Sequence, residues 1–510
     1  MKKGLLKSIS ASAKMKYTTV GIIFTALVIA IVILLNVIIS AFASNHRTYI
    51  DMTDEQVYSM SDAIKSLMDE NFEKTGAQVE IIFPYDKSAA DSTTANSYIH
   101  STAKLLEQRY KDNISLSYHD VVRDPDFYRK NNFAKSASSN TIIIAKKNSD
   151  GTFAGEYQAY RQATFFSGDE NGNLYGYDGE YVFASAIIRL TLEENPIVYF
   201  TTGHSEKFEA EKDENGNYIL NDDGTPKLKG LATVFEDIGF SVKLLDRETL
   251  SQGVPEDARS VVIYDPQFDF SQDEMDKISS YFTQSHGHVM CFVSYDKDFD
   301  NLYYNIEALT GIEFNAGDRV NGESNALVRA TVPSNDATKK YFPSLLEISA
   351  NRPVVKNAGY LTFTSNVADG NEYAFGSGIR TIPLLQTTST TEFQGNRQTR
   401  TLMAISSSTR YENMSDYMYS YMLVCPSNAF ATEEYLYSNG LYSNRDVILS
   451  ILQSTTGLQV PINLDTKAFI QYNVDITEKR AAGMTVLMTL LIPALVVVSG
   501  TAVIIRRKRR

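Results

Sequence analysis

Two stretches of the chain contain apolar and small polar residues without a single charged side chain. They are residues 17–44, near the beginning, and residues 481–505, near the end. A helix rises about 1.5 Å per residue, so the second stretch would reach roughly 37 Å. Because the hydrocarbon core of a bilayer is about 30 Å thick, a helix of this length crosses it with some tilt. The pattern therefore predicts two transmembrane helices.

Basic residues flank the outer ends of both predicted helices. Five lysines lie in residues 1–16, and residues 506–510 are all Arg or Lys. Basic flanks stay on the cytoplasmic side, so we expect both termini in the cytoplasm and residues 45–480 on the outer face of the plasma membrane. Ala41-Phe42-Ala43 resembles a signal-peptidase site. A signal core of about 7–15 residues is much shorter than this apolar stretch, which favours an uncleaved anchor.

The predicted spans contain three residues that are unusual in lipid. Thr25 and Asn36 carry polar groups in the first span, and Pro493 lies in the middle of the second. Polar groups in lipid usually hydrogen-bond to another helix, and a proline kink is tolerated where neighbours satisfy the freed carbonyl. These residues are candidate helix contacts, either between the two spans or with a separate multi-span protein.

The residues after the first span predict a small α/β unit at 45–165. Short apolar strands are expected at 79–83, 114–121 and 141–145, with a helix of 3.6-residue period around 99–110. Alternating strands and helices of this kind favour a sheet with helices packed on it.

Residues 166–460 are predicted to form the main α/β domain, followed by a polar stalk at 461–480. Strands alternating with helices over about 195–315 favour a mostly parallel sheet with right-handed crossovers. The strand-rich part from 325 to 460, with a helix capped by Asn444, is expected to continue this domain.

Three segments inside the main domain combine Asp, Asn and Gly. Gly172 and Gly216 each follow an Asn, and Gly224 follows an Asp. This pairing is typical of hairpin turns, and the ligand spacing of a calcium loop is absent.

Charge is distributed very unevenly along the sequence. Neither 1–44 nor 481–510 contains an acid, so all 61 Asp and Glu residues lie between them with 38 bases, a net charge of about −23. Such a surface repels phosphate backbones, and we expect no nucleic-acid partner.

Sequence motifs for common catalytic sites are absent. There is no G-x-x-x-x-G-K-[ST] phosphate loop and no G-x-S-x-G elbow. Cys291 lies close to His286 and His288, but a thiol inside an apolar strand is inert. The two histidines lack a third metal ligand at a suitable spacing. We therefore expect no catalytic residue, no metal and no cofactor.

The two cysteines, Cys291 and Cys425, each lie in an apolar run that is typical of a buried strand. Two buried free thiols are the simpler interpretation. A disulfide between them is possible outside the membrane, and this alternative stays open.

The turn after the strand 197–200 carries candidate ligand or partner contacts. Gly203, His204 and Glu206 lie just past the carboxyl end of a predicted parallel strand, and Asp265 follows the strand 261–264 in the same way. Open α/β sheets bind ligands at this edge. A capped turn with solvated polar groups would explain the same residues.

Seven short segments along the chain form a pattern. In order they are Asp51-Met52-Thr53 through Tyr58-Ser59-Met60-Ser61, Gly179-Glu180, Tyr199-Phe200-Thr201-Thr202-Gly203-His204-Ser205-Glu206, Tyr264-Asp265-Pro266, Ile382-Pro383-Leu384-Leu385 with Ser389, Asn444-Arg445-Asp446 and Ile492-Pro493-Ala494-Leu495. Their order and the two framing spans resemble the Gldg-type proteins, auxiliary components of ABC transport systems first associated with gliding motility. The resemblance covers nearly the whole chain.

The resemblance implies an outer domain similar in fold to class I glutamine amidotransferases, without their catalytic triad. It also implies a non-enzymatic accessory subunit that works beside a separate ABC permease and a separate ATPase, in contact with the lipid bilayer and with a possible cell-surface component. Two alternatives remain, a stand-alone surface binding or scaffold protein and an outer-face hydrolase of amidotransferase-like fold.

Overall fold

The computed structural model describes residues 59–469, with gaps, and four isolated residues of the first apolar stretch. The isolated residues are 27, 30, 31 and 34, and the gaps are 169–173, 214, 222–223, 286, 316, 321–326, 349–352, 365–367, 370–371, 376–377, 389–391, 394–395, 414–415, 439–440, 463 and 465. Among the described residues, no helix is both long enough and apolar enough to cross a bilayer. The second predicted span and nearly all of the first, including Thr25, Asn36 and Pro493, lie outside the described residues.

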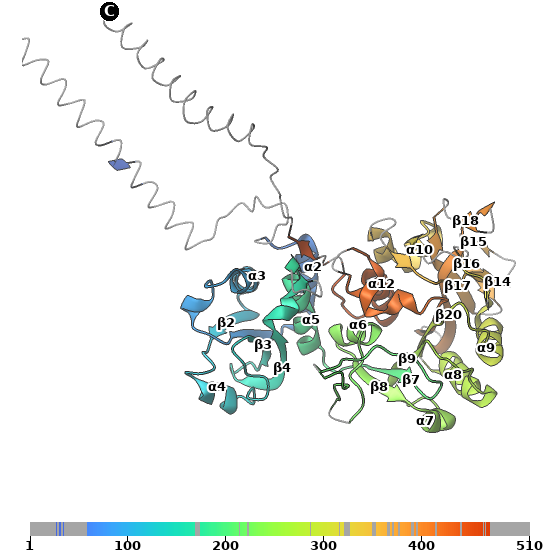
Figure 1. Cartoon of the computed structure of the whole chain (residues 1–510), viewed down its shortest axis with the longest axis horizontal. Helices are drawn as coiled ribbons and strands as arrows, with labels where there is room; N and C mark the ends of the chain where they lie inside the picture. Colours follow the sequence, from blue (N-terminus) through green and yellow to red (C-terminus); the bar gives the residue numbers. More distant parts are fainter. Residues whose placement is uncertain are drawn as a thin grey trace, which may run out of the picture.

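The chain forms a smaller N-terminal lobe and a larger main lobe (Figure 1). The elements of the N-terminal lobe are α2 (Asp62–Thr75), β1 (Gln78–Phe83), η1 (Lys87–Ala89), α3 (Thr94–Arg109), β2 (Ile114–Tyr118), α4 (Pro125–Lys130), β3 (Thr141–Lys147), β4 (Phe153–Arg161), η2 (Gln162–Phe165), β5 (Phe166–Gly168), β6 (Leu174–Tyr177) and α5 (Gly179–Thr191). Its sheet has the order β2-β1-β3-β4, with β1 and β2 parallel. The strands predicted for this part of the sequence are therefore confirmed.

The main lobe contains most of the rest of the described chain. Its elements are β7 (Ile197–Thr201), α6 (Leu231–Asp237), β8 (Ser241–Leu245), α7 (Arg247–Gln252), β9 (Ala258–Tyr264), α8 (Gln272–Gln284), β10 (His288–Phe292), α9 (Asp300–Thr310), β11 (Ile312–Phe314), β12 (Val328–Thr331), α10 (Asp336–Tyr341), η3 (Pro343–Glu347), β13 (Val354–Val355), β14 (Leu361–Phe363), β15 (Ala368–Asp369), β16 (Glu372–Phe375), β17 (Ile379–Thr387), β18 (Glu392–Phe393), β19 (Asn396–Arg397), β20 (Thr401–Asn413), β21 (Asp416–Cys425), η4 (Ala429–Ala431), α11 (Glu433–Leu436) and α12 (Asn444–Thr456). The last strand, β22 (Lys467–Ala468), pairs with β6 and belongs to the N-terminal lobe.

One large mixed sheet organises the main lobe. Its central path runs β13-β12-β17-β20-β21-β10-β9-β7-β8. The five strands from β21 to β8 are parallel to their neighbours within that set, which confirms the parallel arrangement expected for 195–315. From β20 to β13 the strands pair antiparallel. Because β21 pairs with both β10 and β20, the strand-rich C-terminal part extends the same sheet, as predicted.

Helices cover both faces of this sheet. Apolar residues of α6 and α12 pack in one hydrophobic cluster, and those of α8 and α9 pack in another on the opposite face. A strand between two such layers is buried on both sides, so it is apolar throughout rather than alternating. β10 fits this rule, since all five of its residues are buried.

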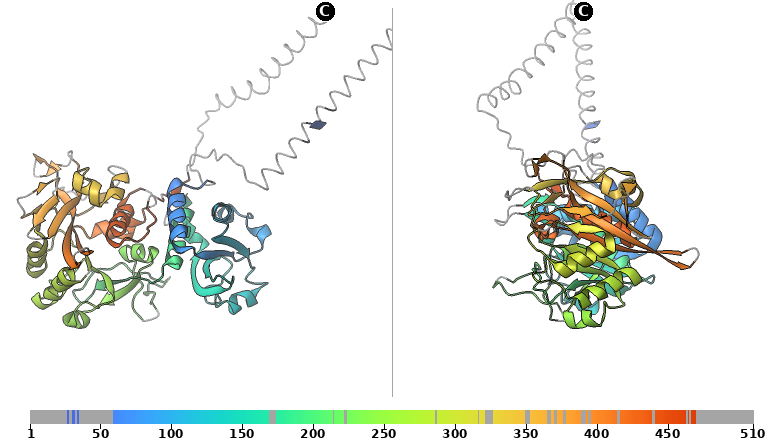
Figure 2. Two further views of the ribbon diagram at one scale, coloured as in Figure 1. Left: turned by 180° about the vertical axis from the view of Figure 1, so that it is seen from behind. Right: turned by 90° about the vertical axis from the view of Figure 1, so that its right-hand side faces the viewer.

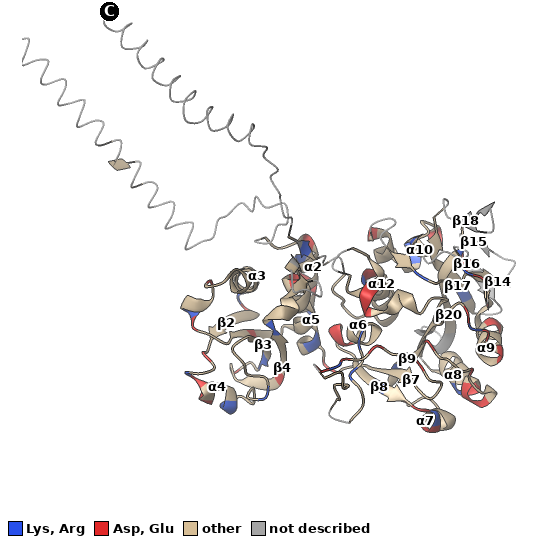
Figure 3. Cartoon of the chain, viewed as in Figure 1, with Lys and Arg blue, Asp and Glu red and all other residues tan. Residues whose placement is uncertain are grey.

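Helices α2 and α5 lie between the small sheet and the main lobe (Figure 2). α5 follows residue 165, the predicted end of the small unit, yet it packs against α2, α3, β3 and β4 of the N-terminal lobe and also contacts α6 of the main lobe. Figure 3 places acidic residues on α6, α8 and α9 of the main lobe.

Two local predictions have different outcomes. The turn at 213–217 closes with an Asp213 N–H bond to the Asn217 carbonyl (2.8 Å), and the turn at 221–225 closes in the same way, so both hairpin turns are confirmed; residues 169–173 lie outside the described part. Asn444 is not the cap of α12, because Ser443 holds that position. The buried Asn444 amide instead bonds the backbone of Val354 at 2.9 Å, tying α12 to an edge strand.

Candidate functional site

The turn after β7 lies at the carboxyl edge of the parallel strands, as the sequence predicts. Gly203 has φ +108°, and a Cβ built there would lie 2.4 Å from Arg247 Cγ. Only glycine adopts this conformation without strain. Ser205 also has a positive φ, of 56°. The backbone is therefore sharply bent here, and the bend directs His204 inward.

The side chain of His204 is enclosed. It is 1% exposed, and its ring stacks on Phe270 with centroids 3.8 Å apart. Nδ1 lies 3.2 Å from Glu206 Oε1, and Nε2 lies 3.3 Å from Glu274 Oε2. The His204 N–H also donates to Glu206 Oε2 at 2.9 Å. Both ring nitrogens thus face carboxylates of the same chain.

Glu274 reaches this histidine because it is the N3 residue of the capping box that begins α8. The N–H and the hydroxyl of Ser271 donate to Glu274 Oε2 at 2.8 and 2.7 Å, and Arg247 Nε donates to Oε1 at 2.8 Å. Burial works against the charge, but the bonds from Ser271, Arg247 and His204 outweigh it and lower the pKa of Glu274 to about 2. The group is a closed ionic cluster joining the β7 turn, α7 and α8.

Two of the predicted contacts, His204 and Glu206, are therefore brought together, but they face each other rather than an open crevice. Their side chains are 1% and 2% exposed. The alternative of solvated polar groups is wrong in this respect, because burial excludes water. We infer that the cluster fixes the shape of the turn.

Asp265, at the end of β9, is a different kind of residue. It is 4% exposed, has φ +46°, and among the described residues its Oδ1 has no hydrogen-bond partner. Burial raises the pKa of this carboxyl, while Asn428 and Lys207 act in the opposite direction. A strained backbone and an unsatisfied buried oxygen are typical of functional positions. Asp265 therefore remains a candidate ligand or partner contact.

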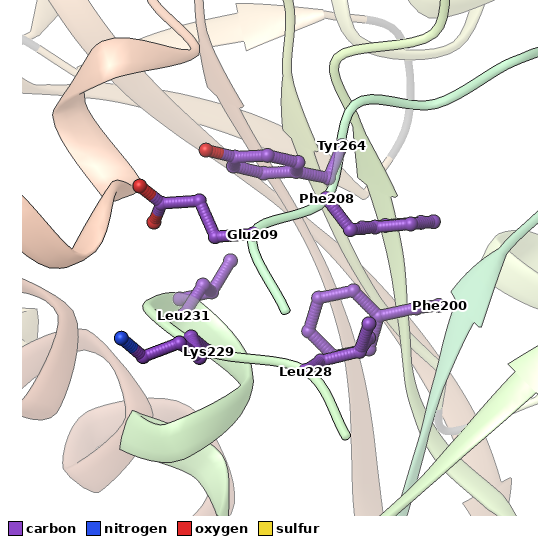
Figure 4. Close-up of a pocket in the computed structure, with 7 residues that line it drawn as sticks. All are labelled: Phe200, Phe208, Glu209, Leu228, Lys229, Leu231 and Tyr264. Carbon is purple, nitrogen blue, oxygen red and sulfur yellow. The ribbon is translucent and has the colours of Figure 1, made fainter. Parts of the chain in front are cut away.

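A pocket lies beside this strand end (Figure 4). It has a cavity volume of about 10 Å³, which is room for about one water molecule. Glu209 lies at its polar side and accepts the Glu433 N–H at 2.6 Å. Burial, together with the charge of Glu433, raises the pKa of Glu209. The lining residues are Phe200, Phe208, Glu209, Leu228, Lys229, Leu231 and Tyr264.

The lobe interface contains a polar network that the sequence gave no reason to expect. Asp237, at the end of α6, accepts the hydroxyls of Tyr181 (2.7 Å) and Tyr437 (2.8 Å). The Arg445 guanidinium lies 3.9 Å from the Tyr181 ring centroid. Burial raises the pKa of Asp237 despite both hydrogen bonds. Its members lie up to 264 residues apart (Tyr181 to Arg445), so no local spacing could have revealed it.

The cysteines do not form a disulfide. Both are free and buried, and they pack in the two clusters on opposite faces of the sheet. Burial raises the pKa of Cys291 to about 12, and the prediction of two buried free thiols is confirmed. His286 lies outside the described residues, and His288 is buried in β10.

The chain shows distant structural similarity to two solved structures. One is the mmIFT52 N-terminal domain (TM-score 0.34, 15% identity, 51% of this chain and 97% of that chain). The other is a ThuA-like protein from Bacteroides uniformis (TM-score 0.31, 10% identity, 54% of this chain and 97% of that chain). No family model and no curated protein matches the sequence. The α/β fold with one large mixed sheet therefore rests on the strand pairing of this chain itself.

Proposed function

We propose that this chain is a non-catalytic, membrane-anchored accessory subunit of an ABC transport system, of the Gldg type. The two apolar stretches would anchor it in the plasma membrane with both termini in the cytoplasm. The two lobes would then stand on the outer face and bind a substrate, a surface component or the permease.

The observation that carries this proposal is the meeting of the two ends of the described chain. Glu180, in the first turn of α5, accepts the Ser61 N–H at 3.0 Å and the Lys467 ammonium at 2.8 Å. The Lys467 ammonium also donates to the Ser59 carbonyl at 2.7 Å. β22 pairs with β6, which places the C-terminal segment on the same lobe.

This arrangement supports a domain attached to a membrane at one point. The Lys467–Glu180 pair is buried, with side chains 12% and 7% exposed, and removing one partner of a buried pair is costly. The chain therefore enters and leaves the domain side by side. Two transmembrane helices that start from one point would lie next to each other in the membrane, where both could contact a permease.

Purification of the full tagged chain from its native membranes in mild detergent tests the proposal. We expect a multi-span permease and an ATPase with a phosphate-binding loop to co-purify. As a control, residues 481–505 are replaced by an unrelated spanning helix, which keeps membrane insertion but removes the helix contacts. Recovery of the wild-type chain alone, or with wall glycan and no transporter subunit, would contradict it and favour a stand-alone surface protein.

The topology is tested separately. Protease added to intact cells should cleave within residues 45–480, and a tag on either terminus should be reached only after the membrane is opened. A tag accessible from the medium would overturn the membrane arrangement.

A further inference from the structure

The pocket beside Tyr264 lies where the order of the parallel strands reverses. β7 pairs with β8 on one side and with β9 on the other, and β10 and β21 follow beyond β9. In open α/β sheets, ligands bind outside the carboxyl ends of the strands at such a reversal. Phe200, near the end of β7, and Tyr264, the last residue of β9, both line the pocket. The pocket therefore occupies the place in this fold where a ligand site is expected.

The chain between β7 and α6 forms one side of the pocket. Its two arms pair antiparallel at Ala210 and Leu228, and the Lys229 N–H donates to the Glu209 carbonyl at 2.8 Å. Each arm contributes two neighbouring residues to the lining, Phe208 and Glu209 from the first and Leu228 and Lys229 from the second. Phe208, Glu209 and Lys229 are half-buried, so this side of the pocket is the one that reaches the surface.

Two aromatic rings border the pocket. The rings of Phe208 and Tyr264 lie within 18° of parallel, with centroids 6.1 Å apart. Figure 4 shows both rings edge-on, with Leu228 and Leu231 on the far side of the space that the rings border. The face of an aromatic ring carries partial negative charge and attracts a cation. The two rings therefore favour a positively charged group in this space.

The charged side chains at the pocket do not balance. The Lys229 ammonium forms an ion pair with the Glu433 carboxylate. Glu209 accepts the Glu433 N–H at 2.6 Å, and within the described part of the chain no Lys or Arg forms an ion pair with it. One negative charge is thus left without a cation. Burial and the charge of Glu433 raise the pKa of Glu209, as expected for a carboxylate in this situation.

A second acceptor lies on the same side of the pocket as the Glu209 carboxylate. The Tyr264 hydroxyl donates to the Asn428 carbonyl at 3.2 Å, and its oxygen can still accept a hydrogen bond. Figure 4 shows this hydroxyl and the Glu209 carboxylate on one side and the ring of Phe200 on the other. The polar side of the pocket thus offers acceptors.

We propose that this pocket binds a primary ammonium group on an unbranched stem, as at the end of a lysine side chain. The cavity of about 10 Å³ holds one group of the size of water, and an ammonium head is such a group with three donors. It would donate to the Glu209 carboxylate and the Tyr264 oxygen, beside the ring faces. Calcium or magnesium fits less well, because these ions take about six or more oxygen ligands and most of the lining is apolar.

The inference names a ligand class for the outer domain, and it rests on the proposed function only for the location of the site outside the cell. Glu209 also has a structural role, since it accepts the first N–H of α11, and one water molecule would fill the same cavity. Binding of an amine by the chain alone separates these roles.

The full-length chain in deuterated detergent micelles is titrated with n-butylammonium chloride, and binding is followed by saturation-transfer difference NMR. We expect a ligand signal that saturates with concentration, and a much weaker signal from n-butanol, which has the same stem without the charge. Sodium or potassium chloride at equal concentration should displace little of the amine.

Three substitutions connect the binding to the pocket. E209Q keeps an oxygen for the Glu433 N–H but removes the charge, and should weaken amine binding by about tenfold or more, the size of a hydrogen bond to a charged group. F208L keeps an apolar side chain without the ring and should weaken binding by about 2–5-fold. E211Q is the matched control, because Glu211 lies on the same arm, pairs with Lys227 at 2.7 Å and does not line the pocket; it should bind as the wild type does.

Equal amine affinity of the wild type and E209Q, or equally tight binding of n-butanol, overturns the proposal. Displacement of the amine by equimolar potassium chloride overturns it in favour of an alkali-metal site. If circular dichroism shows that E209Q does not fold, F208L and the comparison with n-butanol decide the outcome. Since the measurement needs no transporter subunit, its failure leaves the expected co-purification with a permease and an ATPase untouched.

Discussion

Glu274 is expected to be a major source of stability in the main lobe, and its removal gives a quantitative test. Its carboxylate accepts bonds from the Ser271 N–H, the Ser271 hydroxyl and Arg247 Nε at 2.7 to 2.8 Å, and it faces His204. The side chain is 5% exposed. The fall of its pKa from 4.5 to about 2 corresponds to about 3 kcal/mol of folding free energy.

The sign of the pH dependence follows from the lowered pKa. The charged form is favoured in the folded state, so its contribution is fully present above about pH 4.5, the unfolded value. It is lost as the pH falls from there toward about 2. E274Q should therefore destabilise the protein by about 3 kcal/mol at neutral pH. It should also flatten the fall in stability across the acidic window.

Urea unfolding of the wild type and E274Q, followed by far-UV circular dichroism, measures both effects. The chain has no tryptophan, so fluorescence is a poor reporter. E256Q, at an exposed loop position, is the matched control and should change stability by less than about 0.5 kcal/mol. If E274Q is as stable as E256Q at neutral pH, or keeps the wild-type slope in acid, the carboxylate does not hold the cluster together.

Three further outcomes follow from named contacts. G203A should destabilise by about 1–3 kcal/mol in thermal unfolding, and more than G253A, where φ is also positive but nothing lies within 4 Å of a Cβ; equal effects would refute the predicted clash. Neither Cys291 nor Cys425 should react with a thiol reagent until urea unfolds the chain, and one equivalent reacting in buffer would contradict their burial. K467M should cost about 3 kcal/mol and raise hydrogen exchange at 59–61, and unchanged exchange would argue against the tie between the chain ends.

Much of the secondary structure follows from local pattern. The strands β9 and β10 contain the continuous apolar runs Val261–Tyr264 and Val289–Phe292, and the capping box Ser271–Glu274 marks the start of α8. These features depend on residues that are close together in the chain, so the local sequence alone favours one secondary structure for each segment. The cap of α12 is the informative error, because a buried bond from Asn444 to the edge strand β13 outweighs the capping preference of the same side chain.

The candidate site shows the limit of local reasoning. The sequence places His204 after a parallel strand, but its partner Glu274 lies 70 residues away in the chain. The two side chains meet only because the fold places the β7 turn beside the start of α8. The hydrogen bonds of His100 with Asp91 and Tyr118 likewise join a helix to a turn and a strand.

The sequence by itself determined the apolar stretches at both ends, the strong acidity between them, the alternation of strands and helices, and the burial of both thiols. These are properties of composition and periodicity, which each segment carries alone. Only the tertiary structure decided that the mixed sheet joins residues 197–425, that α5 lies between the lobes, and that Ser61 and Lys467 meet at Glu180. The reason is physical: hydrogen bonds and ion pairs between distant residues depend on chain topology, and the same polar side chain is solvated in one topology and buried in another.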